Sequence, residues 1–298
     1  MVTALTGAAL PVRIVTDLAH GGRWTSLRAG DREWLWHRDE PRRAGVAPGD
    51  AFADAGGVEE CLPTVRGVPD HGDVWSRPWR RENAGDGADG ADGADGADRV
   101  DHPDFRLTRR IGGGPGGGAV VDYRLTAAPG YRFLWAAHAL LDVSRDGRIE
   151  LPPGAQALHY PDGGARREPF TWPSAGGTGD AARTRFDLLG PDDGTASGAV
   201  VEAATATVRD GTDRLRFALD VAGQPASIAL WRNLGGFPEG APYRSIGVEP
   251  MLGRVFDLAT AGEGDAARVP ASGEVRWRLT VTAAGASAAT AAASAPGR

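Results

Sequence analysis

Short runs in which apolar and polar residues alternate recur along most of this 298-residue chain. Over 214–221, for example, every second residue is apolar, so that Leu215, Phe217 and Leu219 share one face of an extended segment. Val, Thr and aromatic residues are frequent in these runs, and Gly, Pro and Asp bound them, which is typical of β-strands. We predict strands over 11–15, 24–28, 105–110, 120–127, 183–189, 200–208, 215–221, 227–231 and 275–282.

Helical patterns are weak by comparison. No run of ten or more residues has the 3.6-residue periodicity of an amphipathic helix, and the 44 Gly and 21 Pro residues disfavour long helices. The predicted fold class is therefore all-β, as a large antiparallel β-sandwich in which two sheets pack face to face. We expect a single domain over 1–282.

Three segments depart from the strand pattern. Residues 85–98 repeat Gly, Ala and Asp with too little apolar surface to pack, so we expect a disordered loop there. The Ala-rich tail over 283–298 is also expected to be disordered. The Gly-rich run 112–118 contains the GxGxxG pattern of dinucleotide-binding proteins, but a predicted strand follows it instead of a helix. We interpret this run as a hairpin connection.

Composition narrows the classes of partner. The formal net charge of -6 at pH 7 disfavours a nucleic-acid partner, which would require a basic face. The chain has no Lys, which excludes Schiff-base and phosphate-loop chemistry. No stretch approaches the roughly 20 apolar residues of a membrane span, and the N-terminal residues lack a basic leader. We expect a cytoplasmic monomer or homodimer that binds a small molecule, with no membrane partner.

Cysteine and histidine spacing gives no sign of a disulfide or a metal site. Cys61 is the single cysteine, and its apolar flanks favour a small packed thiol over a nucleophile. Four of the six histidines show no metal-ligand spacing and are interpreted as structural or solvated, namely His20, His37, His102 and His159.

Two histidines and one glutamate are candidates for acid and base chemistry. His71 lies in a Pro-Asp-His-Gly-Asp segment, whose local pattern is equally typical of a surface turn. His138 lies in an apolar stretch, where it is either a hydrogen-bonded core residue or a tuned acid. Glu249 precedes a proline at an apolar strand, where the alternatives are an ion pair with an arginine or a functional carboxylate.

Three motifs resemble those of the aldose 1-epimerase (galactose mutarotase-like) family. They are 56–64 (GGVEECLPT), 69–79 (PDHGDVWSRPW) and 247–253 (GVEPMLG). The nearest branch is the one with glucose-6-phosphate 1-epimerases and uncharacterised aldose epimerases. The resemblance implies a galactose mutarotase-like supersandwich that interconverts sugar anomers without a metal or an organic cofactor, on a free sugar or a sugar phosphate.

The resemblance also implies roles for individual residues. Glu249 would be the base, His138 the acid, and His71 a hydrogen-bonding partner of the ring. Arg77 would grip hydroxyls or an anionic group, and Asp70 stands beside His71 where galactose mutarotases are rich in Asn. Further candidates for sugar contacts are Trp75, Trp79, Trp172, Trp231 and Asn233. The alternative is a carbohydrate-binding or sugar-sensing protein without turnover, but a pure binding site has no need of an acid and a base together.

Overall fold

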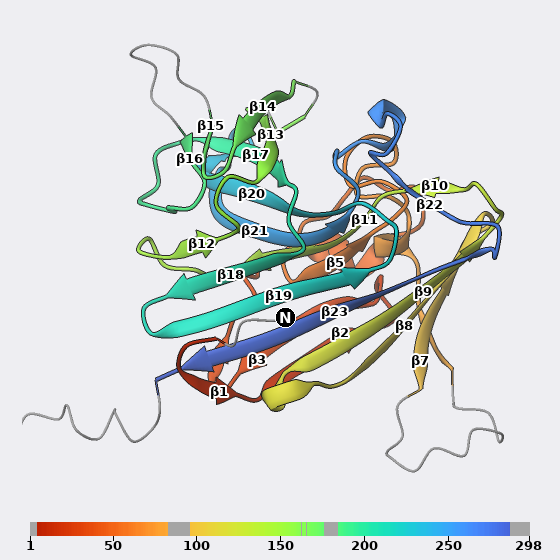
Figure 1. The fold of residues 1–298 in the computed structure, drawn as a ribbon, viewed down its shortest axis with the longest axis horizontal. Coiled ribbons are helices and arrows are strands. Elements are labelled where there is room, and N and C mark those ends of the chain that lie inside the picture. Colours follow the sequence, from red (N-terminus) through yellow and green to blue (C-terminus); the bar gives the residue numbers. More distant parts are fainter. Residues whose placement is uncertain (1–4, 83–95, 162, 165, 176–183, 287–298) are drawn as a thin grey trace, which may run out of the picture.

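The chain folds into two large antiparallel sheets that pack face to face. The computed structural model describes residues 5–82, 96–161, 163–164, 166–175 and 184–286. Within these residues the only helical elements are short 3₁₀ turns, and the two sheets form the layers of a sandwich (Figure 1). The predicted all-β antiparallel sandwich is confirmed.

One layer is a nine-stranded sheet with the order β12-β18-β19-β23-β9-β8-β7-β6, to which β1 adds by pairing with β23. In β19 the side chains of Leu215, Phe217 and Leu219 are all buried, as the alternating pattern predicts. The strands of this sheet are β1 (Ala8–Leu10), β6 (Arg80–Glu82), β7 (Ala97–Asp101), β8 (Phe105–Gly113), β9 (Ala119–Ala127), β12 (Arg148–Glu150), β18 (Thr205–Asp210), β19 (Asp213–Val221) and β23 (Glu274–Gly285).

The other layer is a twelve-stranded sheet with the order β16-β15-β14-β13-β17-β20-β21-β11-β5-β3-β2, and β4 pairs with β3. Its strands are β2 (Val12–Asp17), β3 (Arg23–Ala29), β4 (Arg32–Glu33), β5 (Val58–Cys61), β11 (Trp135–Leu141), β13 (Gln156–Tyr160), β14 (Glu168–Thr171), β15 (Ser174–Ala175), β16 (Thr184–Arg185), β17 (Ala196–Val201), β20 (Ala226–Phe237) and β21 (Tyr243–Leu252). The smaller elements are the strand pair β10 (Arg132–Phe133) and β22 (Ala267–Arg268), and the 3₁₀ turns η1 (Pro41–Gly45), η2 (Val74–Ser76), η3 (Pro115–Gly117) and η4 (Leu258–Thr260).

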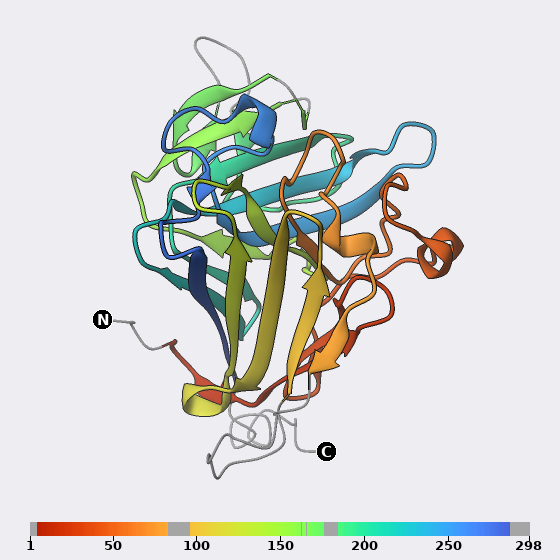
Figure 2. The same cartoon turned by 90° about the vertical axis from the view of Figure 1, so that its right-hand side faces the viewer.

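Strand β11 is buried on both of its faces. Trp135, Ala137 and Leu141 point into the main core between the sheets. The alternate residues point to the other face, which is covered by loops and by the β20–β21 hairpin. Figure 2 shows this hairpin (light blue) and the segment between β4 and β5 (red to orange) extending on the same side of the molecule. A strand covered on both faces gives a nearly continuous apolar run, which is why no alternation is visible in this stretch of the sequence.

Several predicted boundaries require correction. The predicted strand over 200–208 is two strands, β17 and β18, in different sheets, because an apolar run continues across the turn between them. Of the predicted strand 183–189, only the two residues of β16 are extended. Residues 97–98 of the expected loop belong to β7, and residues 283–285 of the expected tail belong to β23. The remainder of that loop, apart from residue 96, and the tail beyond residue 286 lie outside the described residues. The run 112–118 does connect the hairpin of β8 and β9.

Candidate active site

Neighbouring strands of the twelve-stranded sheet bring together a histidine and a glutamate. In the register of β11 and β21, Leu140 pairs with Gly247, which sets His138 opposite Glu249. Cross-strand partners in an antiparallel sheet point to the same face. This face is the one turned away from the main core, because the residues on either side of His138 belong to that core. The two side chains therefore meet at the base of the loops that cover the sheet.

The histidine and the glutamate form a buried pair of titratable groups. The Nε2 atom of His138 lies 3.7 Å from Oε1 of Glu249, and the two residues are 9% and 2% exposed. Burial raises the pKa of Glu249, and the charges of His138 and Arg66 only partly offset this. Burial lowers the pKa of His138, which the carboxylate of Glu249 partly offsets. In the described part of the chain, no guanidinium lies within ion-pair distance of Glu249.

A second histidine approaches this pair from a tight turn. His71 has a backbone φ of 62°, which is uncommon for a residue other than glycine. Its ring stacks on Phe52 with centroids 3.6 Å apart and stands at 86° to the ring of His138, with centroids 4.9 Å apart. Its Nδ1 atom lies 3.2 Å from Oδ2 of Asp70. One face of the His71 ring is thus covered by Phe52, and one of its nitrogens faces the carboxylate of Asp70.

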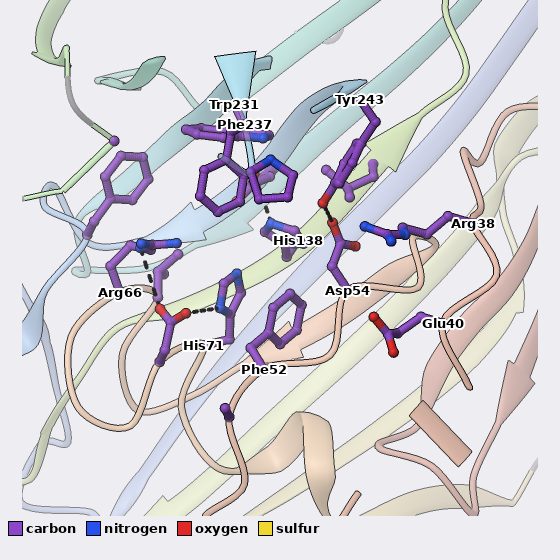
Figure 3. A pocket seen from close by; sticks show the side chains of 18 of the residues that line it. Arg38, Glu40, Phe52, Asp54, Arg66, His71, His138, Trp231, Phe237 and Tyr243 are labelled. Carbon is purple, nitrogen blue, oxygen red and sulfur yellow. Dashed lines mark hydrogen bonds and ion pairs between the residues drawn. The ribbon is translucent and has the colours of Figure 1, made fainter. Parts of the chain in front are cut away.

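These residues line a cavity of about 360 Å³, which Figure 3 shows from close by. Its size lies at the small end of the range for ligand pockets. A Cβ atom at Gly247 would lie 2.5 Å from Oε1 of Glu249, so a glycine is needed at this position to leave room for the carboxylate. Aromatic rings form much of the wall, and they come from Phe52, Trp231, Phe237, Tyr243 and Phe256. Such a lining suits the apolar face of a pyranose ring, with polar groups between the rings for its hydroxyls.

Five residues singled out from the sequence line this cavity. They come from four separate parts of the chain and are Asp70, His71, His138, Trp231 and Glu249. Glu249 lies inside β21, and the proline that follows it does not end the strand. Their assigned roles remain predictions, but the fold places all five around one space.

The tryptophans expected from the sequence as sugar platforms lie mostly in the interior. Trp79 is 4% exposed and donates from Nε1 to the carbonyl of Val74, while Trp172 is 5% exposed and belongs to the main core. Trp75 is 1% exposed, and its ring lies at 75° to that of Phe52 with centroids 5.0 Å apart. All three rings are buried and none belongs to the cavity lining, and their contact with a sugar stays a prediction.

Two polar candidates also lie outside the cavity lining. Asn233 is fully buried and shapes the tip of the β20–β21 hairpin, where its Nδ2 donates to the carbonyl of Phe237. Its Oδ1 accepts from the backbone N–H groups of Gly236 and Phe237 at 3.0 Å. Arg77 follows η2, and its carbonyl accepts from the N–H of Gly21. Neither Asn233 nor Arg77 belongs to the cavity lining, and their contact with a substrate stays a prediction.

Sequence reasoning missed several cavity residues. Phe52 and Asp54 come from the long segment between β4 and β5, and Tyr243 begins β21. Arg66 also lines the cavity, and its Nε lies 3.5 Å from Oδ1 of Asp70. The available signal was the position of Asp54 two residues before the Gly-Gly motif, which begins at Gly56.

The remaining sequence expectations concern residues outside the cavity. Glu59 and Glu60 point to opposite faces of β5, as expected for strand neighbours: Glu59 pairs with Arg43 and Glu60 with Arg109. Burial raises the pKa of the Cys61 thiol well above its usual value, which agrees with a packed, unreactive side chain. Among the described residues, no group of three His, Cys, Asp or Glu side chains is arranged to hold a metal ion. No helix in this part of the chain is long and apolar enough to cross a membrane.

Solved structures with the same architecture identify the fold. The chain is similar to a protein from Klebsiella pneumoniae, with 14% identity, a TM-score of 0.66 and coverage of 95% of this chain and 79% of the other. It is similar to a protein from Escherichia coli K12, with 14% identity, a TM-score of 0.64 and coverage of 94% and 99%. Both are provisionally named aldose 1-epimerases. The chain has the galactose mutarotase-like fold.

A third relative with the galactose mutarotase-like fold carries that fold in its name. It is a galactose mutarotase-like protein from Clostridium acetobutylicum, with 10% identity, a TM-score of 0.59 and coverage of 93% of this chain and 94% of the other. No protein-family model and no curated protein matches the sequence. At these identities the likeness establishes the fold, while the function has to be argued from the cavity.

Proposed function

We propose that the cavity interconverts the anomers of an aldose by opening and reclosing its hemiacetal ring. In the opening step, the carboxylate of Glu249 takes the proton of the anomeric hydroxyl, the bond from the anomeric carbon to the ring oxygen breaks, and protonated His138 gives its proton to the ring oxygen. Rotation about the bond next to the new aldehyde turns the other face of the aldehyde towards the hydroxyl that closes the ring. The reverse transfers then close the other anomer and return both side chains to their starting states.

The separation of the acid and the base is the observation that carries this proposal. The two oxygens that exchange protons are bonded to the same carbon, so an acid and a base must act close together. The distance of 3.7 Å between His138 Nε2 and Glu249 Oε1 meets this requirement without a hydrogen bond that would occupy both groups. The reaction moves two protons and breaks one C–O bond with no change of oxidation state, so it needs no redox cofactor.

The burial of the pair favours proton transfer in both directions. A carboxylate whose pKa is raised is a stronger base, and an imidazolium whose pKa is lowered is a stronger acid. In the reactive form, His138 is a positively charged imidazolium and Glu249 is an ionised carboxylate. Because the two groups interact, the protons come off in steps that belong to the pair.

The other polar cavity residues have supporting roles in this proposal. His71 hydrogen-bonds the ring oxygen or a neighbouring hydroxyl from its Nε2, since its Nδ1 faces Asp70. Asp70 in turn lies beside Arg66, so these three side chains form one chain of charges and donors along the cavity wall. Trp231 offers a ring against which the apolar face of the sugar packs.

A free monosaccharide is the substrate class that we infer, with a hexose phosphate as the narrower possibility. The small cavity suits a single sugar ring. For a phosphate, the arginines that line the cavity are Arg38, Arg42 and Arg66. Arg42 is already paired with Glu40, and Arg66 with Asp70, which favours the uncharged sugar. The names of the E. coli and K. pneumoniae relatives agree with an aldose 1-epimerase activity.

The second candidate function is sugar binding without turnover, on the same cavity. Saturation-transfer NMR of anomeric exchange separates the two, over a panel of glucose, galactose, other aldoses and glucose 6-phosphate. We expect faster exchange of at least one free aldose in the presence of the protein. Line broadening without faster exchange on any sugar would favour the binding protein and refute the epimerase.

A further inference from the structure

The cavity has two ends, and the proposed reaction uses only one of them. Figure 3 shows Arg66 and His71 on one side of His138, and Asp54 and Arg38 on the other. The first end carries the His71–Asp70–Arg66 chain. The second end presents a carboxylate that the proton transfers do not need. This carboxylate, Asp54, is half-buried and belongs to the cavity lining.

Two hydrogen bonds hold the Asp54 carboxylate in a fixed orientation. Its Oδ1 accepts from the backbone N–H of Gly56 at 3.0 Å, and its Oδ2 accepts from the hydroxyl of Tyr243 at 2.5 Å. The backbone of Gly56 packs directly against that of Trp36, because a Cβ atom at Gly56 would lie 2.1 Å from the carbonyl oxygen of Trp36. The loop that carries the carboxylate is therefore closely packed at this point.

The donor from Tyr243 is fixed as well. Its ring stacks on Trp36 with centroids 5.1 Å apart and an interplanar angle of 16°, and the guanidinium of Arg38 lies 4.7 Å from the ring centroid. Burial and the hydrogen bond to Asp54 both raise the pKa of Tyr243, so its hydroxyl stays protonated and keeps donating. Asp54 is thus oriented from two elements that are distant in sequence, the loop before β5 and the start of β21.

The carboxylate has acceptor capacity left over. An ionised carboxylate offers about four lone-pair sites, and the donors from Gly56 and Tyr243 use two of them. Among the described residues, the hydrogen-bonding partners of the Asp54 carboxylate are these two neutral donors, and its charge also acts on Arg23 and His138. A fixed acceptor at the edge of a cavity suits a ligand that brings donors, and sugar hydroxyls are such donors.

We propose that Asp54 is the residue that selects the sugar, by accepting hydrogen bonds from hydroxyls remote from the anomeric carbon, and that Tyr243 positions it. The inference rests on the proposed epimerase function, because it takes the anomeric carbon to lie at His138 and Glu249. Asp54 then holds the ring at its far end and takes no part in proton transfer. Its contribution is to binding and to discrimination between epimers that differ in those hydroxyls.

The test compares Asp54→Asn and Tyr243→Phe with the wild type on the parent sugar and on its deoxy analogues. Asp54→Asn should raise KM about tenfold with kcat nearly unchanged, since it weakens binding but leaves the acid and base intact. It should also abolish the preference of the wild type for the parent sugar over one deoxy analogue. Tyr243→Phe should have a smaller effect in the same direction, and the double variant should be no worse than Asp54→Asn alone.

Asp50→Asn is the matched control. Asp50 lies in the same segment, accepts a hydrogen bond from the N–H of Ala47 and does not line the cavity.

An unchanged KM and an unchanged preference for the parent sugar over the deoxy analogue in Asp54→Asn would overturn the inference. A lowered Tm with no other change would mean that the carboxylate only holds the loop in place. If the wild type binds sugars without turnover, the proposed function fails, whereas the ratio of Kd values for Asp54→Asn and wild type still tests Asp54. If the wild type binds no sugar of the panel, both fail.

Discussion

Glu60 and Glu249 are both buried carboxylates of the twelve-stranded sheet, but they lie on opposite faces of it and have opposite surroundings. Glu60 faces the core, where it accepts from Arg109 at 2.8 Å, from Tyr123 at 2.9 Å and from Trp135 at 2.8 Å. Glu249 faces the cavity, where Nε2 of His138 lies 3.7 Å from its Oε1. The first carboxylate is held by donors that keep their protons at neutral pH. The second faces a histidine, whose pKa is lowered by burial and which can therefore release its proton more easily.

The comparison separates a structural charge from a reactive one. A buried carboxylate that is fully hydrogen-bonded to an arginine is compensated and has little capacity left to accept a proton. A buried carboxylate without such a partner has its pKa raised, as Glu249 has, and remains a base. Burial alone therefore does not mark a catalytic residue in this fold, because burial also raises the pKa of Glu59, to about 7, although Glu59 is paired with Arg43 and lies outside the cavity lining.

The largest effect expected from this contrast is on stability. Arg109→Met introduces an apolar side chain of similar length and removes the buried guanidinium that pairs with Glu60 and Asp98. We expect the free energy of unfolding to fall by about 3–5 kcal/mol, the range for breaking a buried ion pair by removing one partner. Urea denaturation measures it. A loss below about 1 kcal/mol, as for a surface pair, would contradict the structural role of the network.

The next largest effect is on turnover. His138→Asn should lower kcat for anomeric exchange at least about 100-fold, the scale for the loss of a general acid. His159→Asn is the matched control, because His159 is also a buried strand histidine but lies outside the cavity. If His138 is a packed core residue only, the variant would instead lower Tm and leave the rate of the folded fraction unchanged, and the acid role would pass to His71.

A smaller effect concerns the pH profile of kcat/KM. The reaction needs Glu249 ionised, so the rate should fall at low pH, with a limb above the ordinary carboxyl value of 4.5 because burial raises the pKa of Glu249. It needs His138 protonated, so the rate should also fall at high pH, with a limb below 6.5 because burial lowers the pKa of His138. The result is a narrow bell. A rate that stays level from pH 5 to pH 9 would contradict the assignment of the two groups.

The fold was more predictable from the sequence than the site was. Alternation reports which face of a strand is buried, so strands such as β19 are visible directly, whereas β17 and β18 were merged because the same pattern crosses their turn. For the site, a large aromatic ring suits both a core and a sugar platform, and only the structure separates Trp79 from Trp231. For Asp54 the sequence signal was its position two residues before the Gly-Gly motif, but that signal does not predict how the long loop packs against β21.

The central claim is that Glu249 is a base and not a structural acceptor, and Glu249→Gln tests it most directly. The substitution keeps the size of the side chain and removes its charge. Glu150→Gln is the control, because Glu150 is an exposed glutamate paired with Arg209. By saturation-transfer NMR, Glu249→Gln should lose at least about 100-fold of the anomeric exchange rate with sugar binding nearly intact. Full activity in this variant would contradict the account.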